Sequence, residues 1–115
     1  MILYLTSRAD WEKLKDLDSF ISPSFETDGF IHCSTVEQVV TVANSFFKDT
    51  GDLLLVVIDP VKLRSELIYE GEFKGHTGFP HVYGPINMDS VTDVLEFHSE
   101  ALTGYVLPTE LRNLI

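Results

Sequence analysis

The run LLLVVI, Leu53 to Ile58, constrains the fold more than any other stretch, because six consecutive apolar side chains must all leave water. Successive side chains of a strand point to opposite faces, so such a run is typical of a strand that is buried on both faces. The adjacent valines favour an extended backbone. We therefore predict a strand that is covered on both sides.

The composition supplies enough apolar material for one core. The chain has 115 residues, 44% of them hydrophobic, including eight phenylalanines. A chain of this length is typical of a single domain, and this composition excludes a disordered protein. We predict one domain over residues 1–115.

The first half of the chain is predicted to alternate strands and helices. Ser34 to Glu37 match the S-x-x-E capping box, so a helix is expected to begin there. Its apolar face would hold Val36, Val39, Val40, Ala43, Phe46 and Phe47. The expected order before that helix is a strand over 2–6, a helix capped by Ser7 and bearing Trp11 and Leu14, a loop over 18–29 and a strand over 29–34.

In the second half, Asp59 and Pro60 predict the start of a short helix that ends near Arg64. Four glycines between 71 and 84 indicate a loop, pliable enough for a lid. The other expectations are a strand over 66–70, a strand over 90–98, and a tail with one strand and a final helical turn. This order predicts an α+β fold with a mixed sheet and short flanking helices.

The charge balance limits the partners. Eight basic residues stand against 18 acidic ones, with a formal net charge of −10. Because a nucleic-acid backbone is held by clustered Lys and Arg, we expect no nucleic-acid partner. A small ligand with one or two phosphates stays open, since helix N-termini and backbone N–H groups can hold it.

The single cysteine, Cys33, excludes an internal disulfide and is typical of a reducing compartment. The first 15 residues have neither a basic start nor an apolar run long enough for a signal peptide or a membrane helix. We therefore expect a cytoplasmic protein with no membrane partner.

The segment DGFIHCST, Asp28 to Thr35, places a histidine and two hydroxyls where a strand meets a helix. His32 and Ser34 share one face of the strand, and the helix start presents free N–H groups. Such a corner suits a ribose, a phosphate or a carboxylate. In the other interpretation, Ser34 only caps the helix and His32 bonds a loop carbonyl.

The segment FPHVYG places His81 and Tyr83 on one side of an extended backbone, with Val82 toward the core. These two side chains either line a cleft or bond the backbone of a turn. Glu70 closes the preceding strand, where a carboxylate could stabilise a developing cation or act as a base. Its neighbours Glu66 and Glu72 leave open which glutamate is functional, and each could simply be solvated.

Metal binding is not expected. The chain has no Cys-x-x-Cys or His-x-x-x-His pair, and His76 and His81 lie five apart in a predicted loop. Cys33 is expected to be a small buried hydrophobe rather than a nucleophile.

Together, DGFIHCST with Gln38, IYE and FPHVYGPIN resemble the bacterial family known as domain of unknown function 952 (DUF952), from Tyr4 to the strand after Asn87. The resemblance implies the ADP-ribosyltransferase-like fold, a small split mixed β-sheet whose cleft holds NAD in active relatives. It would place His32 beside the nicotinamide ribose, with Glu70 as the residue that stabilises the ribosyl cation. Ser34, Thr35, Gln38, His81 and Tyr83 would line the ligand site.

Three functions follow as hypotheses. The first is an NAD-dependent, ADP-ribosyltransferase-like enzyme that acts on a small molecule or a protein acceptor. The second is a non-catalytic module that binds a small ligand in the same cleft. The third is an interaction domain in which both motifs are structural. A common cleft for His32 and His81 would favour the first two over the third.

Overall fold

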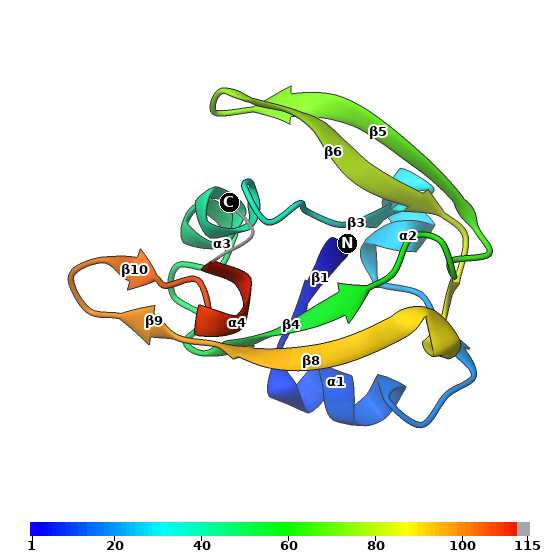
Figure 1. The fold of residues 1–115 in the computed structure, drawn as a ribbon, viewed down its shortest axis with the longest axis horizontal. Helices are drawn as coiled ribbons and strands as arrows, with labels where there is room; N and C mark the ends of the chain where they lie inside the picture. The colour runs from blue at the N-terminus through cyan, green and yellow to red at the C-terminus, as the bar shows by residue number, and fades with distance from the viewer. Residues whose placement is uncertain (113–115) are drawn as a thin grey trace.

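Helices of four to eight residues and antiparallel strands make up the part of the chain that the computed structural model describes, residues 1–112. Figure 1 shows their arrangement. In chain order they are β1 (Ile2–Thr6), α1 (Arg8–Leu14), β2 (Ser19–Phe20), α2 (Ser24–Asp28), β3 (Ile31–His32), α3 (Val39–Phe46), β4 (Leu53–Ile58), β5 (Glu66–Phe73), β6 (His76–Tyr83), β7 (Ile86–Asn87), the 3₁₀ turn Met88–Ser90, β8 (Val91–Phe97), β9 (Ser99–Glu100), β10 (Gly104–Tyr105) and α4 (Thr109–Arg112).

Two three-stranded sheets form the frame of the fold. Their strand orders are β1-β4-β8 and β3-β6-β5, and the short pairs β2-β7 and β9-β10 lie beside them. Every pairing of these strands is antiparallel. The α+β class is confirmed, but the expectation of a mixed sheet is wrong. The helices do not act as crossovers between parallel neighbours, since β1 pairs with β4 only after three helices and two strands have intervened.

Strand β4 is buried on both faces, as its apolar run predicts. Leu53, Leu55 and Val57 join the core that packs against α3 and the C-terminal segment. The alternate residues of β4 join a second core, where Trp11 of α1 and Ile31 of β3 also pack. All six side chains of β4 are at most 5% exposed, so the strand separates two apolar layers.

The N-terminal strand and helix form as predicted. Ser7 caps α1, because its hydroxyl accepts a hydrogen bond from the backbone N–H of Asp10 at 3.1 Å. Trp11 is buried and packs edge-on against Phe20. The predicted loop over 18–29 is wrong in part, since it contains β2, which pairs with β7, and α2, which ends at Gly29 with φ of 79°.

The capping-box prediction is wrong. Ser34 lies in a β-bridge with Leu3, and the two residues exchange backbone hydrogen bonds of 2.8 and 2.9 Å. The helix starts at Val39, and the side-chain oxygen of Gln38 accepts from the N–H of Thr35 at 2.9 Å. Bridging to β1 therefore outweighs the local capping signal.

The helix predicted after Asp59 does not form, whereas the strand and the helical turn predicted for the tail are confirmed. Asp59 accepts a hydrogen bond from the N–H of Val61 at 3.0 Å and stabilises a turn, so no helix runs from Pro60 to Arg64. The tail contains one strand, β10, which pairs with β9, and the helical turn α4, as predicted; its end, 113–115, lies outside the described residues.

The predicted loop from Gly71 to Gly84 is instead most of a β-hairpin. Strand β5 continues past Glu70, and the pairing with β6 reaches from Glu66 and Tyr83 to Phe73 and His76. The glycines serve this hairpin: Gly75 forms the turn with φ of 84°, and Gly71 takes φ of 82° where the pairing is interrupted. The prediction of a loop over these residues is therefore wrong.

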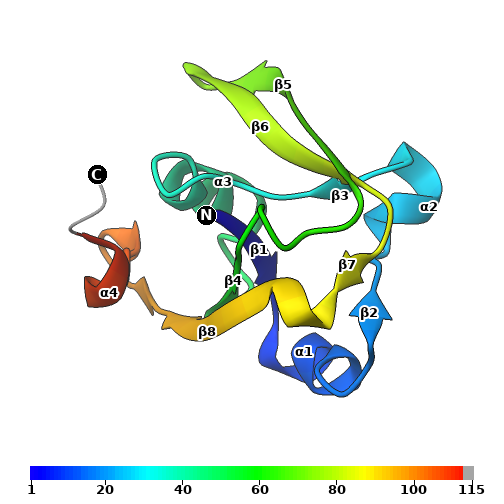
Figure 2. The same ribbon diagram turned by 45° about the vertical axis from the view of Figure 1, so that its right-hand side comes forward.

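The hairpin stands apart from the sheet β1-β4-β8. Figures 1 and 2 both place the turn of the hairpin above α3, with β3 beneath its other end.

None of the helices within residues 1–112 has the length and apolar character that a membrane-spanning helix needs.

Gly104 tests how closely the C-terminal strand pair packs against α3. It has φ of 75°, and an added Cβ would overlap the side chain of Asn44, which accepts the N–H of Tyr105. We expect Gly104→Ala to lower the free energy of unfolding by about 1–2 kcal/mol for the left-handed backbone and about 1–3 kcal/mol more for the overlap. Denaturant unfolding measures both.

Gly51→Ala is the matched control, because Gly51 has φ of 86° and open space around the added Cβ. It should carry only the backbone cost. Equal losses of unfolding free energy in the two variants would show that the side chain of Asn44 moves aside at no cost in stability.

Candidate functional site

A cleft of about 790 Å³ lies between the hairpin, α3 and the end of β1. Its walls combine aromatic rings from the hairpin and from α3 with hydroxyls near the start of α1 and α2. The lining residues are 3–7, 10, 22–24, 32–34, 42, 46, 47, 50, 53, 70–73, 79 and 81. Ligand sites in proteins have volumes of roughly 300–1,000 Å³, so the cleft can hold a small molecule.

Contacts from the start and the end of α3 hold the hairpin above it. The buried Gln38 donates its side-chain N–H groups to the carbonyls of Thr77 and Gly78, at 3.1 and 3.2 Å. Phe46 at the end of α3 packs against Phe73, with 5.1 Å between ring centroids. The roof of the cleft is thereby fixed at both ends of the helix.

Glu70 stands at one end of the cleft with two hydrogen bonds to a single oxygen. Its Oε1 accepts from the hydroxyl of Tyr83 and bonds Nδ1 of His81, the latter at 2.9 Å. These two bonds, that of Tyr83 foremost, hold the pKa of Glu70 below its ordinary value. The same bond raises the pKa of Tyr83. Glu70 is therefore an anion with a fixed orientation.

Two histidines complete this end of the cleft. His32 of β3 is paired with His81 of β6, and their rings meet edge to face with 5.2 Å between centroids. Phe30 stacks on His81 at 4.0 Å and 14°. Asp28 bonds Nε2 of His32 at 2.8 Å. The side chain of His81 is only 12% exposed, whereas that of His32 is 54% exposed.

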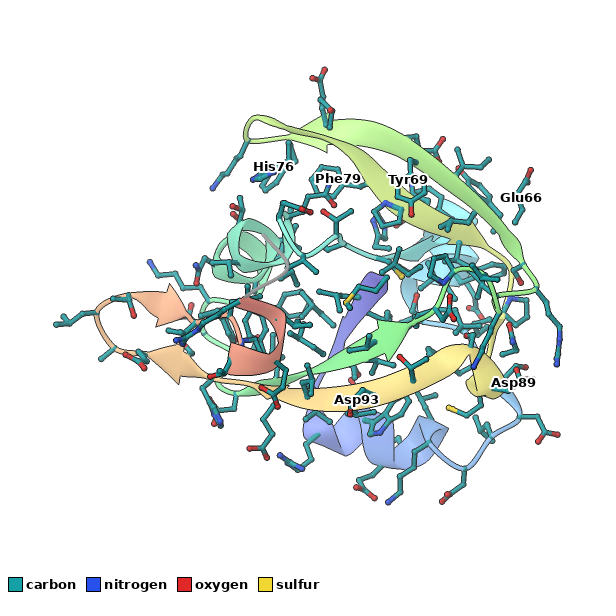
Figure 3. The ribbon with its side chains drawn as sticks, viewed as in Figure 1. Glu66, Tyr69, His76, Phe79, Asp89 and Asp93 are labelled. Carbon is teal, nitrogen blue, oxygen red and sulfur yellow. The ribbon has the colours of Figure 1, made fainter. Side chains whose placement is uncertain are left out.

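The structure brings the two sequence motifs to one cleft. His32 and His81 both line it, and so do Glu70 and Ser34. This common location favours a ligand site over a purely structural role for both motifs. The choice among the three glutamates is reduced to two, because Glu72 also lines the cleft and Glu66 does not. Figure 3 shows Glu66 at the end of the hairpin remote from the turn.

The remaining predicted residues lie around the site rather than in it. Tyr83 reaches the cleft through Glu70. Thr35 contributes its N–H to Gln38, and neither residue lines the cleft. The amide of Gln38 is fully engaged by protein groups, which gives it a positioning role. A direct ligand contact from Thr35 or Gln38 stays a prediction.

The sequence analysis missed several aromatic side chains of the site. Asp28 and Phe30 both belong to the motif DGFIHCST, and their spacing from His32 could have indicated a contact. Phe46 was expected on the apolar face of a helix, but it is 66% exposed at the cleft. Phe79 projects from β6 on the side of α3 and β3 (Figure 3), and no local signal indicates this direction.

Cys33 is buried, and burial raises the pKa of its thiol to about 12. It is a small buried side chain, as expected, and not a thiolate nucleophile. Within residues 1–112, no group of three or more His, Cys, Asp or Glu side chains has the arrangement of a metal site.

The hydrogen bond from Tyr83 should control the charge of Glu70. We expect Tyr83→Phe to raise the pKa of Glu70 toward its ordinary value of 4.5, because the bond that most favours the anion is lost. A carboxyl whose pKa is lowered by folding stabilises the protein above its unfolded-state pKa, and this stabilisation is lost as pH falls through the folded-state pKa. The variant should therefore lose less stability than wild type on acidification.

NMR titration of the Glu70 carboxyl carbon measures this shift. Tyr69→Phe is the control, since Tyr69 neighbours Glu70 but points to the opposite face of the hairpin. An unchanged Glu70 pKa in Tyr83→Phe would contradict the prediction.

Solved structures with this fold come from Caulobacter crescentus. A crystal structure of its protein CC0527 matches with a TM-score of 0.83 and 31% identity, and the match covers 96% of each chain. The solution NMR structure of CC0527 matches with a TM-score of 0.70 and 28% identity, over 99% of this chain and 95% of that one. No curated protein matches the chain.

A family model extends this comparison to sequence. The family described as "Protein of unknown function (DUF952)" matches residues 5–94, which include the hairpin, β3 and both motifs. The match ends within β8, before β9, β10 and α4. Because the match covers most of the 115 residues, the chain belongs to the DUF952 family.

Proposed function

We propose that this protein is an ADP-ribosyltransferase-like enzyme that binds NAD or a related nucleotide in the cleft and breaks its glycosidic bond. One observation carries the proposal: Glu70, His81 and His32 converge at one end of a cleft that is large enough for a small ligand. Family membership alone assigns no reaction, because a fold does not specify chemistry.

The charge of Glu70 suits this chemistry. When the bond between the ribose carbon and the nicotinamide nitrogen breaks, its electron pair leaves with nicotinamide and positive charge develops on the ribose. A fixed carboxylate beside that carbon stabilises the charge. The two hydrogen bonds to Oε1 favour the anion and set its direction, and they leave Oε2 to face the sugar.

The two histidines would orient the ligand and accept a proton or a hydrogen bond from the group that adds to the ribose. His81 is held through Nδ1 by Glu70, so its Nε2 is the atom that can accept a proton or a hydrogen bond. The more exposed His32 would contact the ribose. The acceptor that adds to the ribose carbon would be water, a small molecule or a protein side chain.

A second candidate is a non-catalytic module that binds the same ligand. The observation in its favour is that Oε1 of Glu70 already accepts two hydrogen bonds within the protein. A carboxylate that serves to hold His81 and Tyr83 in place needs no reaction. The two candidates share the cleft and differ only in turnover.

Glu70→Gln separates them. If Glu70 stabilises the cation, the variant should release nicotinamide from NAD at least tenfold more slowly than wild type while its NAD affinity stays within about threefold, since charge but not shape is lost. Nicotinamide release is followed by chromatography. Glu37→Gln is the matched control, because Glu37 is exposed and lies outside the cleft. Equal release in wild type and Glu70→Gln would remove Glu70 from this role.

The location of the ligand is tested by calorimetric titration of NAD. His32→Ala should weaken binding tenfold or more, about 1.4 kcal/mol, because a group that contacts the ribose is removed. His98→Ala is the control, since His98 is exposed and does not line the cleft. Equal affinities in both variants would place the ligand away from β3, and absence of binding in wild type would refute the proposal.

A further inference from the structure

We propose that the cleft selects an N-linked riboside with a positively charged base and without phosphate, in preference to the phosphorylated nucleotides. This inference rests on the glycosidic-bond cleavage in the proposed function and changes the preferred substrate at the same site from a nucleotide to a nucleoside. It comes from the charges, rings and hydroxyls that line the cleft.

The ionised side chains of the lining carry negative charge. Three carboxylates, Asp10, Glu70 and Glu72, line the cleft, and none of its lining residues is Lys or Arg. The whole chain adds to this field with its net charge of −10. Clefts lined by one sign of charge concentrate ligands of the opposite sign. Such a lining attracts a cationic base and repels a phosphate.

Aromatic rings give the cation a place to bind. Phe46, Phe47, Phe73 and Phe79 line the cleft on the sides of α3 and the hairpin. The face of an aromatic ring attracts an organic cation, and aromatic cages are the usual sites for quaternary ammonium groups. The protein already uses one ring in this way, because the ammonium of Lys74 lies over Phe73, 5.4 Å from its centroid.

The neutral polar groups of the lining suit a sugar. Ser7, Ser22 and Ser24 contribute hydroxyls, and those of Ser22 and Ser24 bond each other at 2.8 Å. Hydroxyls both donate and accept, so they match the hydroxyls of a ribose. Ser34 and the two histidines add to this set from β3 and β6.

A phosphate would find no Lys or Arg side chain among the lining residues. The N–H of Asp10 in the first turn of α1 is already bonded to Ser7. Arg8 pairs with Glu96, and the ammonium of Lys74 bonds the hydroxyl of Ser45 at 3.0 Å. Neither basic side chain lines the cleft. The cation-binding groups and the absence of Lys and Arg from the lining thus favour the same ligand.

The test compares three probes in calorimetric titrations of the full chain: nicotinamide riboside, nicotinamide mononucleotide and NAD. The riboside should bind at least tenfold more tightly than either phosphorylated probe. Added salt should weaken the binding of the riboside and reduce the difference in affinity between the riboside and the phosphorylated probes, because screening reduces attraction and repulsion alike. The uncharged reduced riboside should bind at least tenfold more weakly than the cationic form.

Variants of the exposed Glu72 identify the cause. Glu72→Gln should reduce the preference for the riboside over the mononucleotide by threefold or more, whereas Glu37→Gln should leave it unchanged. A selective loss of NAD affinity in Lys74→Gln would assign phosphate recognition to the hairpin turn and overturn the inference.

The outcomes separate this inference from the proposed function. If NAD or the mononucleotide binds more tightly than the riboside, the selectivity is wrong and the nucleotide enzyme stands. If none of the three probes binds at millimolar concentration, the inference and the proposed function both fail.

Discussion

The fold depends on the burial of β4 on both faces. A strand with six apolar side chains needs two separate covers, and the chain provides them from different elements. α3 and the C-terminal segment cover one face, while α1, β3 and β6 cover the other. Because β3 and β6 are needed as a cover, the two strands that carry His32 and His81 are brought together by packing. The position of the site is thus a consequence of the core.

The cleft combines the fixed carboxylate of Glu70 at one end with aromatic and hydroxyl side chains along the rest of its lining. Glu70 is oriented by Tyr83 and His81, and Phe30 stacks on the ring of His81. Each member restricts the rotation of the next, which is the arrangement that preorganised electrostatic sites use. Away from this end, the lining consists mainly of aromatic rings and hydroxyls. A ligand would therefore be held by its charge at one end and by shape along the rest.

Strong local signals predicted part of the structure, and long-range packing decided the rest. The burial of β4 and the cap of α1 at Ser7 follow from residues close in sequence, and both were predicted. The helix start predicted at Ser34 is wrong because the backbone of Ser34 pairs with that of Leu3, which is distant in the sequence. The glycines of the hairpin indicate flexibility locally, yet the pairing with β5 assigns them to a strand and its turn. For the site, the motifs indicated His32, His81 and Glu70, whereas the direction of Phe79 depends on the curvature of the hairpin.

Gln38 has a consequence for how the cleft can change shape. Its amide bonds the backbone ahead of α3 through one atom and the hairpin through the other. Raising the hairpin would leave a buried N–H group without an acceptor, or else would pull Gln38 away from the N–H of Thr35. Movement of the hairpin away from α3 is therefore coupled to movement of the backbone at the start of that helix. A ligand that needs a wider cleft would therefore have to break one of these hydrogen bonds.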